Sequence, residues 1–116
     1  MDRDKASKLL GLLGGDFASV RLGTPEEIQL FEENLGEAIQ MTNVRYPTNG
    51  QDKRNYDILR KTYGIETEAL PVKEIAGQYF ITPNRVRQIN NRSVRRLKHT
   101  KKWRPEVYAR IIGRNF

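Results

Sequence analysis

Amide and guanidinium side chains repeat at helical spacing in the segment 83–104. With a step of about 100° per residue, one helix face collects four of them: Asn84, Gln88, Asn91 and Arg95. The borders of that face carry four cations: Arg85, Arg87, Arg92 and Lys98. In the major groove of DNA an amide can form two hydrogen bonds with adenine and a guanidinium two with guanine, while border cations reach phosphates. These residues therefore predict a helix that reads duplex DNA.

The positive charge of this segment is uncompensated. It contains nine Lys or Arg residues and no Asp or Glu, whereas a solvated helix would more often carry Glu four residues from a cation. Residues 1–45 hold five basic and eight acidic residues, and residues 46–116 hold sixteen and six. This asymmetry favours a polyanionic partner for the C-terminal half. The alternative is a solvated basic face that serves solubility.

We divide the expected DNA contacts into two sets. Base contacts are predicted from Asn84, Arg85, Arg87, Gln88, Asn91, Arg92 and Arg95. Phosphate contacts are predicted from Lys73, Thr82, Lys98, Lys101, Lys102 and Arg104. The last three could instead belong to a solvated linker. Trp103 is expected in the core rather than on a base.

A helix-turn-helix over about 72–98 is expected to position these residues. Thr82 is the predicted N-cap of a helix that begins at Pro83 and ends near Lys98. A shorter helix, from Val72 to about Tyr79, precedes it across a roughly three-residue turn. Gly77 in the interior of that helix predicts a close backbone approach.

The fold class predicted for the chain is all-α, with four or five helices. A capping box at Thr24 and Glu27 begins one upstream helix. Another is expected from about Asp52 to Tyr63, with Gly64 in the left-handed position that ends it. Shorter helical segments are expected before Gly14–Gly15 and after Pro105. The leucines of the first segment could pack on this chain or on a partner.

Composition excludes several classes of function. The chain has 116 residues, no Cys and one His, which rules out disulfides, thiol nucleophiles and His/Cys metal clusters. There is no apolar run near the ~18 residues of a membrane span, and no acid–base constellation can be assembled. We expect a cytoplasmic protein that is not an enzyme, needs no cofactor, and binds neither membranes nor small-molecule substrates.

The segment LPVKEIAGQYFITPNRVRQINNRSVRRLKH resembles region 4 of bacterial sigma factors. Positions that fit the family pattern follow without a gap: Glu74-Ile75-Ala76, Tyr79, Ile81-Thr82, Arg85-Val86-Arg87-Gln88-Ile89, Val94-Arg95-Arg96-Leu97-Lys98 and His99. ILRKTYGI and WRPEVYARII extend the resemblance over about 52–112. It implies a winged-helix-like DNA-binding domain without a clear wing over 24–116, preceded by residues 1–23 of unknown role.

The resemblance also implies partners. Region 4 binds promoter DNA together with RNA polymerase, and its upstream helices, here between Thr24 and Tyr63, dock on the polymerase beta flap. The family's readers of the −35 element correspond to Pro83, Asn84 and Gln88. Pro83 and Asn84 replace the family's usual Arg and Glu, which predicts a different target site.

Nothing in the chain resembles the region that opens the −10 element. The resemblance therefore implies a free-standing region 4, as in phage or mobile-element regulators, split sigma factors and antitermination factors. Two alternatives stay open. The chain could be an interaction module that binds polymerase or an anti-sigma protein with little DNA contact, which the acidic N-terminal half and Leu9–Leu13 would support. It could also be a small terminase-like DNA-packaging subunit, which would form a ring.

Overall fold

The computed structural model describes residues 1–14, 22–45 and 51–98. These residues form five helices: α1 (Arg3–Leu13), α2 (Pro25–Arg45), α3 (Gln51–Tyr63), α4 (Val72–Tyr79) and α5 (Pro83–Lys98). The described part of the chain contains no strand, which confirms the all-α prediction. The helix expected after Pro105 and the position of Trp103 lie outside the described residues.

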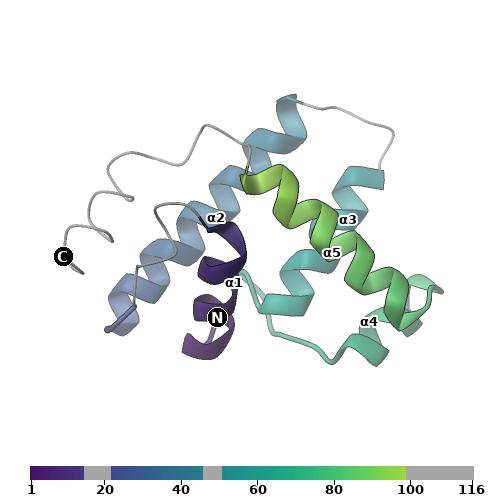
Figure 1. Ribbon diagram of the computed structural model, residues 1–116, viewed down its shortest axis with the longest axis horizontal. Coiled ribbons are helices and arrows are strands. Elements are labelled where there is room, and N and C mark those ends of the chain that lie inside the picture. Colours follow the sequence, from purple (N-terminus) through teal and green to yellow (C-terminus); the bar gives the residue numbers. More distant parts are fainter. Residues whose placement is uncertain (15–21, 46–50, 99–116) are drawn as a thin grey trace.

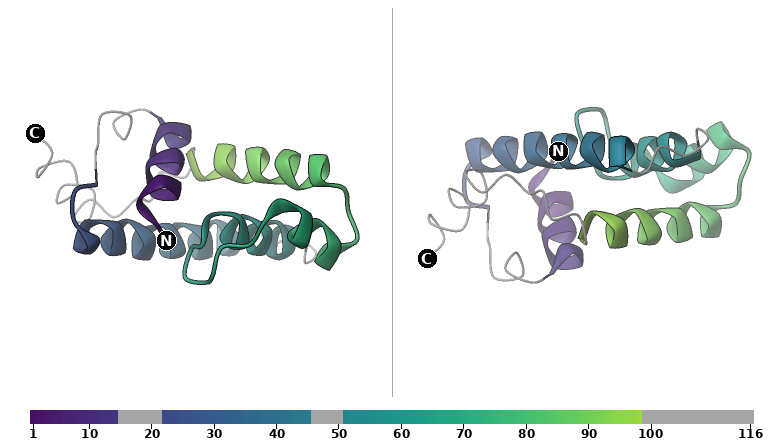
Figure 2. Two further views of the ribbon diagram at one scale, coloured as in Figure 1. Left: turned by 90° about the horizontal axis from the view of Figure 1, so that it is seen from below. Right: turned by 90° about the horizontal axis from the view of Figure 1, so that it is seen from above.

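Helix α5 packs against each of the other four helices. Figure 1 shows α4 and the turn that follows it at one end of α5, with α1 near the other end. In the two perpendicular views of Figure 2, α5 runs along one side of the row formed by α2 and α3, with α1 beside its far end. One side of α5 therefore faces the other helices and the other side is left to solvent.

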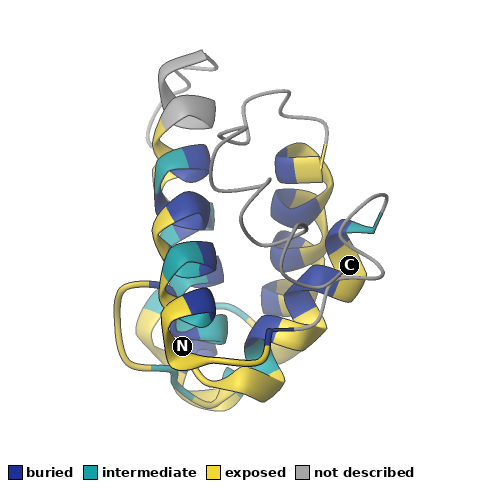
Figure 3. Ribbon diagram, turned by 90° about the vertical axis from the view of Figure 1, so that its left-hand side faces the viewer, coloured by how far each residue is buried: buried dark blue, intermediate teal, exposed yellow. Residues whose placement is uncertain are grey.

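The core consists of two clusters, and α5 contributes to both. Val86 and Ile89, from its first half, pack with Ile58 of α3 and with α4. Val94 and Leu97, from its second half, join a larger cluster with α1, α2 and α3. The buried sides of the helices accordingly face inward in Figure 3.

The leucines of α1 pack on this chain. Leu9, Leu10 and Leu13 are buried in the larger cluster, whereas Leu12 is exposed. This answers the question that the sequence left open. These three side chains are not available to a partner.

The residues predicted to begin α2 and to end α3 occupy those positions in the structure. The Glu27 N–H donates to Thr24 Oγ1 at 3.2 Å, which confirms Thr24 as the N-cap, and the Thr24 hydroxyl donates to the Glu27 carboxylate. Gly64 has φ 73°, and the Ile65 N–H donates to the Arg60 carbonyl at 3.0 Å, as expected for a left-handed cap.

The prediction for Gly77 was wrong. A Cβ placed on this residue would meet no atom within 4 Å, so no other part of the described structure approaches it closely. Gly77 lies exposed on α4. The glycine leaves helix surface open to solvent instead of admitting a neighbouring backbone.

Candidate nucleic-acid interface

The turn between α4 and α5 is fixed by backbone hydrogen bonds and one side-chain cap. The Ile81 N–H donates to the Ala76 carbonyl at 3.0 Å, and Ile81 packs against the smaller core cluster. Thr82 Oγ1 then accepts the Arg85 N–H at 3.1 Å, as an N-cap does. Together these contacts set the direction in which α5 leaves the turn.

The two sides of α5 differ sharply in composition. Its buried residues are Val86, Ile89, Asn90, Ser93, Val94 and Leu97. All seven residues predicted to contact bases are exposed: Asn84, Arg85, Arg87, Gln88, Asn91, Arg92 and Arg95. The leucines of α1 do not cover them. The surface of α5 is therefore free to meet a partner along its length.

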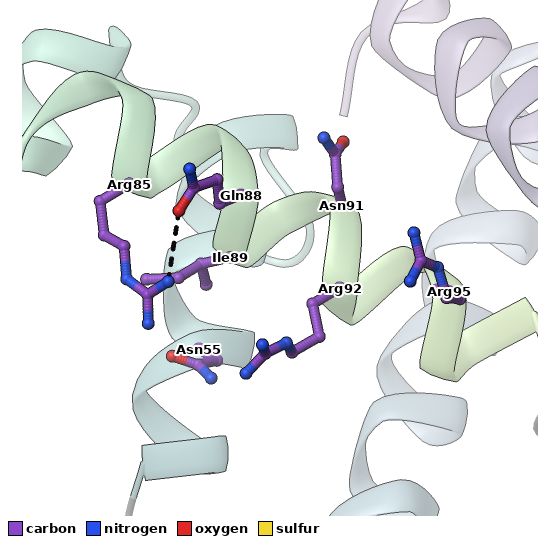
Figure 4. Close-up of a pocket in the computed structure, with 7 residues that line it drawn as sticks. All are labelled: Asn55, Arg85, Gln88, Ile89, Asn91, Arg92 and Arg95. Carbon is purple, nitrogen blue, oxygen red and sulfur yellow. Dashed lines mark hydrogen bonds between the residues drawn. The ribbon is translucent and has the colours of Figure 1, made fainter.

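Five of these seven residues line one cleft between α5 and α3. The cleft has a volume of about 320 Å³ and is lined by Asn55, Arg85, Gln88, Ile89, Asn91, Arg92 and Arg95. In Figure 4 the side chains of Arg85 and Arg92 extend toward Asn55 on α3. The guanidinium groups in it form no ion pair with a carboxylate in the described part of the chain. A group that enters this cleft meets positive charge on the α5 side and an amide on the α3 side.

Two arginines of α5 bond to amides three residues away. Arg85 Nη1 donates to Gln88 Oε1 at 3.3 Å, and Arg87 Nη1 donates to Asn84 Oδ1 at 2.9 Å. Asn84 and Arg87 do not line the cleft. A carbonyl oxygen has two lone pairs, so each amide can still accept a hydrogen bond from a base and donate through its NH₂ group. The two hydrogen bonds with arginine orient these amides and still leave each amide able to form two hydrogen bonds with adenine.

The residues predicted to contact phosphates fall into two groups. Lys73, Thr82 and Lys98 are exposed. Lys98 Nζ lies beside Gly14 at the end of α1, 3.6 Å from where a Cβ of Gly14 would stand, so this ammonium also faces the first helix. Lys101, Lys102 and Arg104 lie outside the described residues.

Asn55 is a member of the interface that was not predicted from the sequence. It comes from α3 and accepts a hydrogen bond from Arg54 Nη2 at 3.3 Å, which brings another guanidinium to this edge. A signal was present, because Asn55 is three residues before Ile58, which packs against α5. Residues at that spacing share one side of a helix.

Asn90 was also missed, and it positions the interface from inside. It is buried on α5, and its Nδ2 donates to Thr62 Oγ1 of α3 at 2.8 Å. Thr62 in turn donates to the Ile58 carbonyl at 2.8 Å. The pair ties α5 to α3 at one rotation about its axis. Spacing alone indicated burial, since Asn90 is four residues from both Val86 and Val94.

Other kinds of site find no support in the residues that the structure describes. They contain no group of three or more Asp, Glu or His side chains that could hold a metal ion. None of the helices in this part is long and apolar enough to cross a bilayer.

Comparison with known proteins agrees with the geometry of α3, α4 and α5. Residues 52–99 match the family model described as Sigma-70, region 4. Neither the curated proteins nor the solved structures gave a match to the chain. Region 4 is a DNA-binding helix-turn-helix type of domain, and its match begins in α3 and takes in the cleft, the turn and all of α5. Residues 52–99 of this chain form a sigma region 4-like helix-turn-helix domain.

Proposed function

We propose that this protein is a sequence-specific DNA-binding transcription regulator that acts together with RNA polymerase. The observation that carries the proposal is the composition of the exposed side of α5. It presents amide and guanidinium side chains and no acidic residue, while the aliphatic side is held by the other helices. Roles that fit are a stand-alone activator, a component of a split sigma factor, or an antitermination factor.

In the proposed complex α5 lies in the major groove. A helix of 16 residues is about 24 Å long and is narrow enough to enter that groove. Gln88, Asn91 and Arg92 would read base edges, and the exposed Lys73 of α4 would reach a phosphate. Asn84 in place of an acidic residue at the start of α5 favours a target unlike the family's usual −35 element.

RNA polymerase is proposed as the second partner, through helices that precede the helix-turn-helix. A shallow depression of about 440 Å³ on α2 is lined by Pro25, Glu26, Gln29, Leu30 and Glu33. Two glutamates and a leucine are among its lining residues, which suits a basic and partly apolar protein surface. The beta flap is the polymerase element that we propose for this contact.

Selection of bound duplexes from a random pool, with and without RNA polymerase, tests both parts of the proposal. We expect one enriched site. On that site Arg85→Ala and Gln88→Ala should each weaken binding by about 1–3 kcal/mol if they make paired contacts with a base. Lys8→Ala, which removes an exposed cation from α1, is the matched control and should leave affinity for the site unchanged.

Salt dependence separates base contacts from phosphate contacts. Each phosphate contact contributes about 0.9 to the slope of log K against log salt. Lys73→Ala should therefore lower the slope by about that amount on every duplex, whereas Gln88→Ala should leave it unchanged. A pool that yields no preferred site, or a site bound equally well by Arg85→Ala and Gln88→Ala, would refute the proposed reading of DNA.

An interaction module with little DNA contact is the second candidate. The acidic depression on α2 favours it. The leucines of α1 do not support this candidate, because three of the four are buried in this chain. Capture of RNA polymerase by a protein that binds no duplex at moderate salt would support this candidate. A ring-shaped oligomer in solution would instead indicate the DNA-packaging alternative.

A further inference from the structure

Phe80 is an exception to the packing of the apolar residues around it. Its side chain is 95% exposed. Its backbone has φ 55° and ψ 43°, the left-handed conformation that ends α4. This position is usually glycine, because a Cβ is strained there, most of all in a bulky residue. Both the exposed ring and the backbone are unfavourable for the free protein, and such outliers cluster at functional sites.

The surrounding contacts hold Phe80 in this conformation. The N–H of Phe80 donates to carbonyls of the last turn of α4, and the next residue, Ile81, donates to Ala76 and packs in the core. On the preceding side Lys61 Nζ bonds to Gln78 Oε1 and to the Tyr79 hydroxyl at 2.9 Å. The ring is thus presented outward by a turn fixed on both sides.

The chemistry of the neighbouring chain indicates what meets the ring. From Ile81 to Lys98 there are six basic residues and no acidic one, so a partner lying on this end of α5 is a polyanion. Phe80 stands three residues before Pro83, which keeps it within about 10 Å of the first turn of α5. In helix-turn-helix proteins the first turn of the second helix, which corresponds to α5, contacts base edges.

A phenyl ring cannot form the hydrogen bonds by which most base edges are read. The one apolar group that base pairs display in the major groove is the C5-methyl of thymine. We infer that Phe80 contacts a thymine methyl at the edge of the site read by the start of α5, and so acts as a specificity-determining residue. This inference rests on the proposed function, since it requires α5 to lie in the groove.

The test uses the site selected by the full-length protein and replaces its thymines one at a time with deoxyuridine, which lacks only the methyl. At one thymine we expect the wild type to bind roughly four-fold more weakly, from the transfer free energy of one methyl group. Phe80→Gly should bind the parent duplex with a similar loss and show no further loss at that thymine. Phe80→Tyr, which keeps the ring, should behave as wild type.

Two controls make a negative result informative. Leu12→Ala removes the other large exposed apolar side chain of the described residues and should not change DNA affinity. Phe80→Gly should raise the melting temperature by about 4 °C, because glycine relieves the left-handed strain, so weaker binding cannot be attributed to unfolding.

The inference is overturned if Phe80→Gly binds the selected site as tightly as wild type, or if no thymine shows the matched loss. A variant that binds DNA normally but loses the complex with polymerase would assign the ring to a protein contact and would equally overturn it. Failure of the proposed function looks different, because the wild type itself would then select no site.

Discussion

Replacing Asn90 by leucine tests how the interface is held in position. Asn90 is buried on α5, and its Nδ2 donates to Thr62. Its Oδ1 is also buried and has no hydrogen-bond partner among the described residues. Leucine has the same branching and number of side-chain heavy atoms. Asn90→Leu therefore removes one satisfied and one unsatisfied polar atom while it keeps the site filled.

The expected change in stability is small because these effects oppose each other. The lost hydrogen bond contributes about 0.5–1.5 kcal/mol, and the buried unpaired oxygen costs about 1–3 kcal/mol. The slightly larger methyl groups of leucine offset part of the gain through overpacking. We expect Asn90→Leu to lie within about 1 kcal/mol of the parent. Asn90→Ala removes the same two polar atoms but leaves a void, and should be less stable than Asn90→Leu by about 2 kcal/mol.

DNA binding should respond differently from stability. The bond between Asn90 and Thr62 is directional and fixes the rotation of α5 about its axis, whereas a leucine packs at several rotations. We expect Asn90→Leu to bind its selected duplex several-fold more weakly although it is folded. Urea titration gives the free energy of unfolding, and a fluorescence titration with the duplex gives the affinity.

Either of two results would refute this reasoning. If Asn90→Leu loses more than about 2 kcal/mol, the unpaired oxygen does not carry the cost assumed for it. A wild-type affinity in a stable Asn90→Leu protein would show that apolar packing alone sets the rotation of α5. In that case Val86 and Leu97 position the interface without help from the polar pair.

Three further substitutions probe the fold. Leu97→Ala empties a fully buried site where the second half of α5 meets α1 and should lower the free energy of unfolding by about 2–5 kcal/mol in urea; a loss below 1 kcal/mol would mean that the site collapses. Gly77→Ala should stabilise α4 by about 0.5–1 kcal/mol, since a Cβ there meets open space, and a lower melting temperature would contradict this. The hydrogen bond from the Lys5 N–H, together with the Lys5 charge, lowers the pKa of Asp2 below 3.8. The ionised Asp2 carboxylate therefore contributes to the stability of the fold above its unfolded pKa, and this contribution is lost as pH falls through the lowered folded pKa. Asp2→Asn should accordingly lessen the loss of stability measured below about pH 4.

The helix-turn-helix was predictable because its signals are local. Pro71 and Pro83 each precede or begin a helix, Thr82 supplies the cap, and the structure gives α4 and α5 the bounds that were expected. The apolar stripe of α5 likewise fixed which side would be buried. Each of these signals depends on residues within one or two turns of one another, so it is present in the sequence before any tertiary contact forms.

The parts that escaped prediction depend on contacts between segments distant in sequence. Asn55 enters the interface because α3 crosses beside α5; its spacing from Ile58 indicates the side of α3 on which it lies, but not that α5 crosses there. Asn90 was not assigned to either side of α5, although its place in the stripe required burial. The structure met that requirement with Thr62, 28 residues away. The leucines of α1 could not be assigned to this chain from their spacing alone.

Because α5 is strongly basic, added salt should change the stability of the free protein and its affinity for DNA in opposite directions. Six cations on 16 residues repel one another, and Arg85 stands in a first turn with no acid, where the helix dipole also disfavours a cation. Added salt screens this repulsion, so the free protein should become more stable. The same salt weakens binding to DNA, because releasing the same counterions into a more concentrated solution gains less free energy. A basic face that serves solubility alone would show only the first dependence. A helix that binds DNA shows both, and the residues responsible for the two should be the same.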